Sequence, residues 1–244
     1  MGGAAAYDYA WLGRVEYLEA WEYQRELARR RARGDIPDTI LLLEHPPVFT
    51  TGRRGPGANL RLPEEALGAP LIETDRGGDI TFHGPGQLIA YLIVDLRASA
   101  LSVVNYVRAL EEAVVRTVRT YGIEAHTECG LTGVWTGEMG SSAEKIAAIG
   151  VRVGKPAGPS GGWVTTHGLA LNVTVDLEWF GRIVPCGIGD RGVASIESLT
   201  GKRPRLEDVA EVLSQALGDV LGRDIRVSRS LVLPAKLCPR PDGL

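Results

Sequence analysis

The chain has 244 residues, of which 44% are hydrophobic and 23% charged, so it can bury a core without a metal ion or a disulfide. Its formal charge of −3 disfavours a nucleic-acid-binding protein, because such proteins are normally basic. The longest apolar run, 88–94, is far shorter than the roughly 20 residues that a membrane-spanning helix needs. The three cysteines have no CxxC spacing and the first residues lack an export segment, so we expect a reducing, cytoplasmic location.

The first half of the chain predicts one helix followed by short strands. Tyr17, Leu18, Trp21 and Ala28 fall on one helical face, and the helix is expected to end within 34–37. Glycine and proline then separate short apolar segments, a pattern typical of strands joined by turns. The predicted strands are 39–43, 48–51, 71–74, 79–83 and 87–96.

The second half contains two clear amphipathic helices. The first follows Ser102, which is suited to cap a helix N-terminus, and is expected to end at Gly122. The second covers 206–221, and strands are predicted at 123–127, 133–137, 145–153 and 164–175. No repeat, linker or shift in composition marks a boundary, so the pattern predicts one α+β domain. An alternative interpretation makes 206–244 a small C-terminal lobe.

Residues 76–87, RGGDITFHGPGQ, concentrate glycine, proline and polar side chains in one segment. Glycine lets a backbone approach a ligand closely and leaves amide N–H groups pointing outward. An arginine and a histidine beside such a turn would suit an acyl, carboxylate or phosphate group. A tight hairpin with a capped histidine is the alternative interpretation, and the residues alone do not decide between the two.

Two further residues have settings that suit catalysis. Lys145, one of four lysines, begins an apolar strand; it is either an edge residue with its ammonium in water or a partly desolvated cation beside a substrate. Cys186 lies in a Pro-Cys-Gly turn that a substrate could reach, and a catalytic thiolate there would need a nearby cation or base. Cys129 and Cys238 lack such a setting and are expected to be structural or incidental.

The remaining motifs bear on nucleotide binding, metal binding and a basic surface. Residues 187–192 match GxGxxG, but no strand–helix unit encloses them, so a nucleotide site is not expected. The four histidines have no ligand-like spacing, so no metal site is expected. The arginines within 29–33 and at 53–54 form either a solvated surface or a basic patch that would attract an acidic protein.

Several segments occur in an order that is similar to one known family. They are EHPPVFT at 44–50, RGGDITFHGPGQ at 76–87, KIAAIGVRV at 145–153, THGLALNV at 166–173 and IVPCGI at 183–188. Together they closely resemble the lipoyl(octanoyl) transferases, also called the lipoate–protein ligase B family. The resemblance covers about residues 17–221, and the tail 222–244 is unassigned.

The resemblance implies one domain, 1–244, of the biotin and lipoate protein ligase type, with a mixed sheet flanked by helices in a class II synthetase-like arrangement. It implies transfer of an octanoyl group from octanoyl-acyl carrier protein to a specific lysine of a lipoyl domain, in lipoate biosynthesis. The expected acceptors are the lipoyl domains of 2-oxoacid dehydrogenase complexes and the glycine cleavage protein. No cofactor, metal ion, nucleic acid or membrane partner is implied.

The resemblance also assigns roles to residues. Cys186 would carry the acyl group as a thioester, and Lys145 would lower the pKa of that cysteine. Tyr91 and His167 would contribute to the substrate site. That site would otherwise be formed by Arg76, Gly77, Gly78, Asp79, Ile80, Thr81, Phe82, His83, Ala148, Ile149, Gly150, Gly168, Leu169 and Ala170.

The segments 137–143 and 154–162 look longer than in the family, which bears on lid shape and partner docking rather than on the chemistry. Three alternative functions stay open. The first is an ATP-dependent lipoate–protein ligase on the same fold, which needs no cysteine. The others are a non-catalytic acyl- or partner-binding module and a thioesterase, in which water accepts the acyl group.

Overall fold

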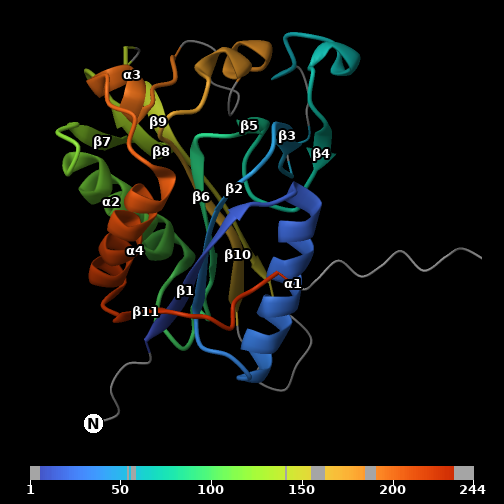
Figure 1. The fold of residues 1–244 in the computed structure, drawn as a ribbon, viewed down its shortest axis with the longest axis vertical. Helices are drawn as coiled ribbons and strands as arrows, with labels where there is room; N and C mark the ends of the chain where they lie inside the picture. The colour runs from blue at the N-terminus through green and yellow to red at the C-terminus, as the bar shows by residue number, and fades with distance from the viewer. Residues whose placement is uncertain are drawn as a thin grey trace, which may run out of the picture.

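The computed structural model describes residues 6–53, 55, 59–140, 142–154, 163–184 and 191–233 (Figure 1). Its centre is a mixed sheet of eight strands in the order β11 (Ile225–Val227), β1 (Tyr7–Arg14), β2 (Thr39–Glu44), β6 (Gln87–Ile93), β10 (Val164–Asn172), β9 (Glu144–Gly154), β8 (Leu131–Thr136) and β7 (Ala125–Glu128). A smaller sheet has the order β4 (Leu71–Glu73), β3 (Val48–Thr51) and β5 (Thr81–His83). The helices are α1 (Tyr17–Arg33), α2 (Val103–Arg119), α3 (Ile196–Thr200) and α4 (Leu206–Leu221), with 3₁₀ turns at Glu64–Ala66 and Leu177–Arg182.

Helices cover both faces of the large sheet (Figure 1). α2 and α4 pack together on one face, where Leu110 and Leu213 belong to the larger core cluster. α1 covers the other face, where Leu27 belongs to a second cluster. β6 and β10 lie between these layers and are buried along their whole lengths, which explains the near-continuous apolar sequence of β6. This arrangement confirms the α+β single-domain fold expected from the sequence.

The predicted long helices are confirmed, although α2 ends at Arg119 with Thr120 as its C-cap, before the expected Gly122. The Ser102 side chain accepts a hydrogen bond from the Asn105 backbone N–H at 3.1 Å, at the start of α2. Gly34, with φ of 81°, ends α1 in the left-handed conformation that favours glycine. α4 has the predicted bounds, 206–221. Among the described residues, no helix is both long and apolar enough to cross a membrane.

The alternative of a separate C-terminal lobe is wrong for the described part of that segment. α4 packs against α2, and β11 adds to the edge of the large sheet by pairing in parallel with β1. β1 itself was not predicted. The burial of its residues does not alternate strictly along the strand, so the local sequence does not predict it. Its neighbours in the sheet, β2 and β11, come later in the chain.

Most of the arginines of α1 form ion pairs with nearby carboxylates. Arg29 contacts Glu22 and Glu26 on the helix surface. Arg33 pairs with Asp35 at 2.8 Å, and both side chains are about half exposed. Such exposed pairs contribute little to stability.

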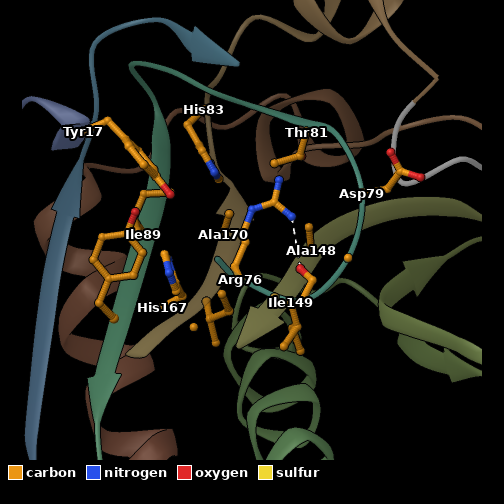
Figure 2. Close-up of a pocket in the computed structure, with 16 residues that line it drawn as sticks. Tyr17, Arg76, Asp79, Thr81, His83, Ile89, Ala148, Ile149, His167 and Ala170 are labelled. Atoms are coloured by element: carbon orange, nitrogen blue, oxygen red, sulfur yellow. Dashed lines mark hydrogen bonds between the residues drawn. The ribbon is translucent and has the colours of Figure 1, made fainter. Parts of the chain in front are cut away.

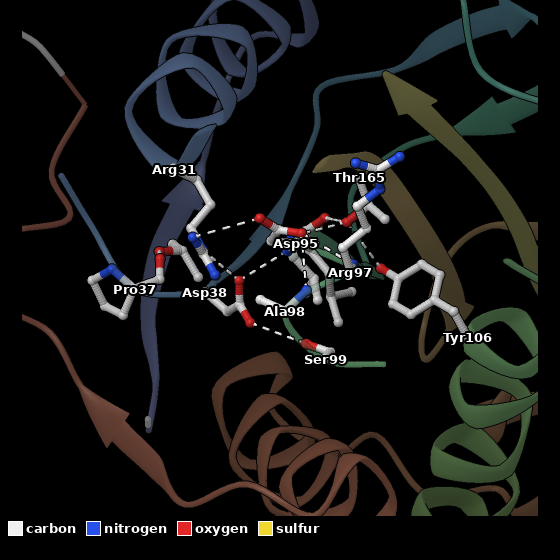
Figure 3. Close-up of polar contacts among 12 residues, drawn as sticks. Arg31, Pro37, Asp38, Asp95, Arg97, Ala98, Ser99, Tyr106 and Thr165 are labelled. Atoms are coloured by element: carbon white, nitrogen blue, oxygen red, sulfur yellow. Dashed lines mark hydrogen bonds and ion pairs between the residues drawn. The ribbon is translucent and has the colours of Figure 1, made fainter. Parts of the chain in front are cut away.

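Arg31 differs, because it joins a buried polar network at one end of the sheet (Figure 3). Its Nε lies 2.6 Å from Asp38 Oδ1, and the two side chains are 16% and 9% exposed. Asp38 also accepts hydrogen bonds from the Asp95 backbone N–H at 2.9 Å and from the Ser99 hydroxyl at 3.4 Å. The network therefore ties the end of α1 to the segment that follows β6.

We predict that Asp38→Ala lowers the free energy of unfolding by about 3–5 kcal/mol, because it removes the closer of the two carboxylate partners of the mostly buried Arg31. The matched control is Asp35→Ala, which removes an exposed arginine–aspartate pair and should cost about 0–1 kcal/mol. Urea unfolding of both variants measures the difference, and equal losses would contradict the network's structural role.

Candidate active site

A cavity that opens to solvent lies where the 76–83 segment meets β9 and β10 (Figure 2). Its mouth is near Gly78, which is exposed, and its inner wall is made of buried side chains. The lining residues are Tyr17, Arg76, Gly77, Gly78, Asp79, Thr81, His83, Ile89, Tyr91, Ala148, Ile149, Gly150, His167, Gly168, Leu169 and Ala170. The residues that the resemblance assigns to the substrate site all line this cavity except Ile80 and Phe82.

Glycine allows one wall of the cavity to form. The Gly77 N–H donates to the Val151 carbonyl of β9 at 3.0 Å. A Cβ atom at Gly150 would lie 2.9 Å from the Gly77 carbonyl oxygen, and one at Gly168 would lie 2.0 Å from the Ala90 carbonyl oxygen. Gly150 and Gly168 are paired in the β9–β10 ladder. Side chains at these positions would push the neighbouring backbone away, so the cavity wall depends on their absence.

The guanidinium of Arg76 is held by carbonyl and hydroxyl oxygens at the cavity wall. Its Nη2 donates to the Thr50 carbonyl at 2.6 Å and to the Thr50 hydroxyl at 3.0 Å, and its Nη1 donates to the Gly77 carbonyl at 3.1 Å. The side chain is buried. These contacts attach the glycine-rich segment to β3.

His45 and Tyr91 form a buried pair beside the cavity. His45 Nδ1 lies 2.6 Å from the Val15 carbonyl, which can only accept, so this nitrogen carries the proton. His45 Nε2 therefore accepts from the Tyr91 hydroxyl at 2.8 Å. Burial lowers the pKa of His45 to about 4, so the ring is neutral near pH 7.

His83 lies close to this pair and is also neutral. Its Nδ1 lies 2.8 Å from Gln87 Oε1, and its ring stacks on Tyr17 with 6.0 Å between centroids. Burial, and then the nearby His45, lower the pKa of His83 to about 3. The histidine rings on this side of the cavity are thus neutral.

His167 has an unusual backbone conformation within β10. Its φ is +59°, although β10 keeps a regular antiparallel register with β9 on both sides of this residue. Its N–H donates to the buried Gln24 side chain at 2.6 Å. The left-handed conformation turns the ring toward the α1 face, where it meets Tyr91 and lines the cavity. Its Nε2 lies 2.9 Å from Asp75, and this hydrogen bond is the main reason why the pKa of Asp75 is lowered.

Lys145 lies in a small recess that adjoins the cavity. The residue is 6% exposed, and its Nζ lies 4.5 Å from the centre of the Trp135 ring. A Cβ atom at Gly133 would lie 3.3 Å from Lys145 Cε, so this glycine leaves room for the side chain. Thr81 and Ala148 line both the recess and the cavity, so the two spaces share a wall. The interpretation of Lys145 as a water-exposed edge residue is therefore wrong.

Cys186 and Cys238 lie outside the described residues, as does most of the GxGxxG match. The structure describes the chain on either side of 185–190. The Val184 N–H donates to the Asn59 carbonyl at 2.8 Å, and Asn59 donates to the cavity residue Asp79 at 2.8 Å. Beyond the segment, Val193 lines the Lys145 recess. Cys129 is exposed in the turn between β7 and β8.

Ile80 and Phe82 lie on the other side of β5 from the cavity. Both are fully buried in a third core cluster, where Phe82 stacks on Trp179 with 4.9 Å between centroids. Thr81 and His83 line the cavity because successive strand residues point to opposite faces. Tyr17 and Ile89 line the cavity too, although the sequence motifs did not indicate them.

Comparisons with known proteins place this geometry in a family. The lipoyl protein ligase A/B catalytic domain matches residues 16–218. The chain belongs to the lipoyl protein ligase A/B family. Octanoyltransferases of this family are similar over most of the chain: that of Chloroflexus aurantiacus is 47% identical over 220 residues, covering 89% of this chain and 95% of the relative. That of Thermobifida fusca is 48% identical over 220 residues, covering 88% and 89%.

A solved member of this fold is the bipartite lipoate protein ligase of Thermoplasma acidophilum, studied with its E2 lipoyl domain. It superimposes with a TM-score of 0.67 at 17% identity, covering 92% of this chain and 87% of that one. At this identity the likeness establishes the shared fold. It confirms that the chain has the lipoate protein ligase architecture expected from the sequence.

We predict that His45 and His83 destabilise the protein as the pH falls from 6.5 to 5. Their folded pKa values, about 4 and 3, lie below the ordinary 6.5, so the unfolded chain takes up protons first. Each histidine then removes about 1.4 kcal/mol per pH unit, or roughly 2 kcal/mol over this interval. Urea unfolding at both pH values measures the loss, and His83→Gln should reduce it by about 2 kcal/mol. An unchanged loss in that variant would show that His83 is not held neutral.

Proposed function

We propose that this protein transfers an octanoyl group to a lysine of a lipoyl domain, through a thioester on Cys186. The observation that carries the proposal is the buried Lys145, whose recess shares a wall with the cavity between the 76–83 segment and β10. The relatives that share 47–48% of its residues are octanoyltransferases, and they match most of the chain.

The cavity suits a medium-length acyl chain. From Ala148 and Ala170, which pair where the recess meets the cavity, to His167 is three residues, or about 10 Å along the strand. That distance is on the order of the length of an extended eight-carbon chain. The acyl carbonyl would then lie near Lys145 and the chain would extend toward His167. Each buried methylene group would contribute about 0.8 kcal/mol.

Chain connectivity supports a position for Cys186 near Lys145. Cys186 is two residues beyond Val184, so its Cα lies within about 7 Å of the Val184 Cα. On the other side of the segment, the Gly192 carbonyl accepts from the Lys145 N–H at 3.0 Å, and the Ala194 N–H donates to the Lys145 carbonyl at 3.0 Å. The described chain that follows this segment therefore lies directly against the residue that would activate Cys186.

The proposed reaction has two acyl transfers. The Lys145 ammonium favours the Cys186 thiolate, which attacks the donor thioester; the C–S bond to the donor breaks, and its thiolate takes a proton from Lys145. The amine of the acceptor lysine then attacks the Cys186 thioester, and the Cys186 thiolate leaves. The proton that the amine loses passes to the now neutral Lys145, which restores the starting state.

The donor proposed here is octanoyl-acyl carrier protein, and the acceptors are lipoyl domains of 2-oxoacid dehydrogenase complexes and the glycine cleavage protein. A thioester donor is already activated, so this reaction needs no ATP. That separates it from the ATP-dependent ligase considered as an alternative. The cytoplasmic location expected from the sequence stays a prediction.

We predict that incubation with octanoyl-acyl carrier protein, without ATP, adds one octanoyl group to Cys186. The adduct should be absent in Cys186→Ser, because a serine hydroxyl is a much weaker nucleophile than a thiolate. Intact-protein mass spectrometry followed by peptide mapping measures it. Cys129→Ser is the matched control, since Cys129 lies in an exposed turn, and should acylate like the wild type. An adduct that persists in Cys186→Ser would contradict the assignment.

We predict that Lys145→Ala slows octanoyl transfer by a factor of about 10²–10⁴, the usual contribution of a positioned acid–base group. Lys202→Ala, at an exposed position between α3 and α4, is the control and should have the wild-type rate. Single-turnover transfer to a lipoyl domain measures both variants. A wild-type rate in Lys145→Ala would remove the role assigned to this side chain.

A further inference from the structure

A chain of buried hydrogen bonds connects the cavity to the strand that carries Lys145. His83 Nδ1 lies 2.8 Å from Gln87 Oε1. Gln87 Nε2 donates to Asn172 Oδ1 at 2.9 Å and to the Phe82 carbonyl at 3.3 Å. Asn172 Nδ2 donates to the Ala194 carbonyl at 2.9 Å. All three polar side chains are nearly inaccessible to solvent, so the chain is part of the interior.

The direction of this chain determines which nitrogen of His83 carries a proton. Gln87 uses its amide nitrogen as a donor to two acceptors, so its oxygen faces His83. His83 Nδ1 must therefore be the donor, and Nε2 is left with a free lone pair. His83 lines the cavity, and Figure 2 shows its ring pointing into it.

Gln87 and Asn172 also line the Lys145 recess. The same two side chains thus form a wall of the recess and hold the cavity-lining His83. The Ala194 residue at the end of the hydrogen-bond chain donates its N–H to the Lys145 carbonyl at 3.0 Å. His83 and Lys145 are consequently fixed relative to each other by one polar network.

The surroundings of His83 oppose its protonation. His45 lies 6.0 Å away between ring centroids, the Tyr17 ring stacks on the other side, and Arg76 and His167 add positive or potentially positive groups. Together with burial, these groups keep the pKa of His83 at about 3. The partner of His83 Nδ1 is the neutral amide of Gln87, which provides no negative charge to stabilise a protonated ring.

We propose that Gln87, supported by Asn172, is a positioning residue that holds His83 as a permanent hydrogen-bond acceptor for the amine of the acceptor lysine. The proposal rests on the proposed function, in which that amine enters beside Lys145. One N–H of the amine donates to His83 Nε2, and Lys145 Nζ takes the proton that leaves. His83 itself gains no proton. The two contacts direct the nitrogen lone pair toward the thioester carbonyl.

The test compares two substitutions that keep the size of the side chain. Gln87→Glu places a carboxylate against His83 Nδ1, which should raise the pKa of His83 and turn Nε2 into a donor in mild acid. Transfer to a lipoyl domain should then fall by about tenfold between pH 7.5 and 6, beyond the change seen in the wild type. Gln87→Met should slow transfer by about tenfold at every pH without a new titration. A wild-type pH profile in folded Gln87→Glu would overturn the proposal.

The matched control is Gln215→Glu on α4, where Gln215 contacts Asp219 at an exposed position. It should leave the pH profile unchanged, and a shift as large as that of Gln87→Glu would overturn the proposal. Acylation of Cys186 alone should be less affected by Gln87→Met than the transfer to the lysine. Equal effects on both steps would contradict a role with the amine.

A measurement on the wild-type protein tests the proposal even if the variants do not fold. Histidine ¹⁵N NMR, with His83→Gln to assign the signal, should show His83 neutral and protonated on Nδ1 from pH 8 down to pH 5. Protonation on Nε2, or titration within that range, would overturn the proposal. Because this readout needs no substrate, it separates failure of the positioning role from failure of the proposed octanoyl transfer.

Discussion

The backbone of residues 76–78 lies directly against β9, and the rest of the site depends on that contact. The Gly77 N–H donates to the Val151 carbonyl, while a Cβ atom at Gly150 would lie 2.9 Å from the Gly77 oxygen. On the other side, a Cβ atom at Gly52 would lie 2.4 Å from the Gly78 oxygen. Glycine is needed on both sides because the backbone passes between two walls. The contact places Arg76 over the inner face of the sheet and closes one side of the cavity.

The site separates a charged end from a neutral one. Lys145 is at the charged end, buried against Trp135 and beside the returning chain at 191–194. The other end, toward His167, is lined by the rings of Tyr91 and His167, which burial keeps neutral. A neutral interior suits an alkyl chain, whereas the nucleophile and the amine need a cation and a proton acceptor. The two environments therefore match the two parts of the substrate proposed here.

Much of the fold could be predicted from the sequence because its elements have local signals. α2 and α4 have regular apolar spacing, and β6 is buried on both faces and has a nearly continuous apolar sequence. β1 could not be found this way, since it is stabilised by strands distant in sequence. At the site, the contiguous 76–83 motif predicted more cavity-lining residues than the structure has. Because side chains alternate along β5, Ile80 and Phe82 point into the core instead. The orientation of His167 depends on one left-handed residue, which a periodic pattern does not reveal.

The most direct measurement is an experimental structure of the octanoyl-enzyme formed from the wild-type protein. We expect the acyl group on Cys186 Sγ, the thioester within hydrogen-bonding reach of Lys145 Nζ, and the chain extended between the 76–83 segment and β10 toward His167. An octanoyl chain bound elsewhere, or a Cys186 sulfur separated from Lys145 by the body of the protein, would contradict the central claim.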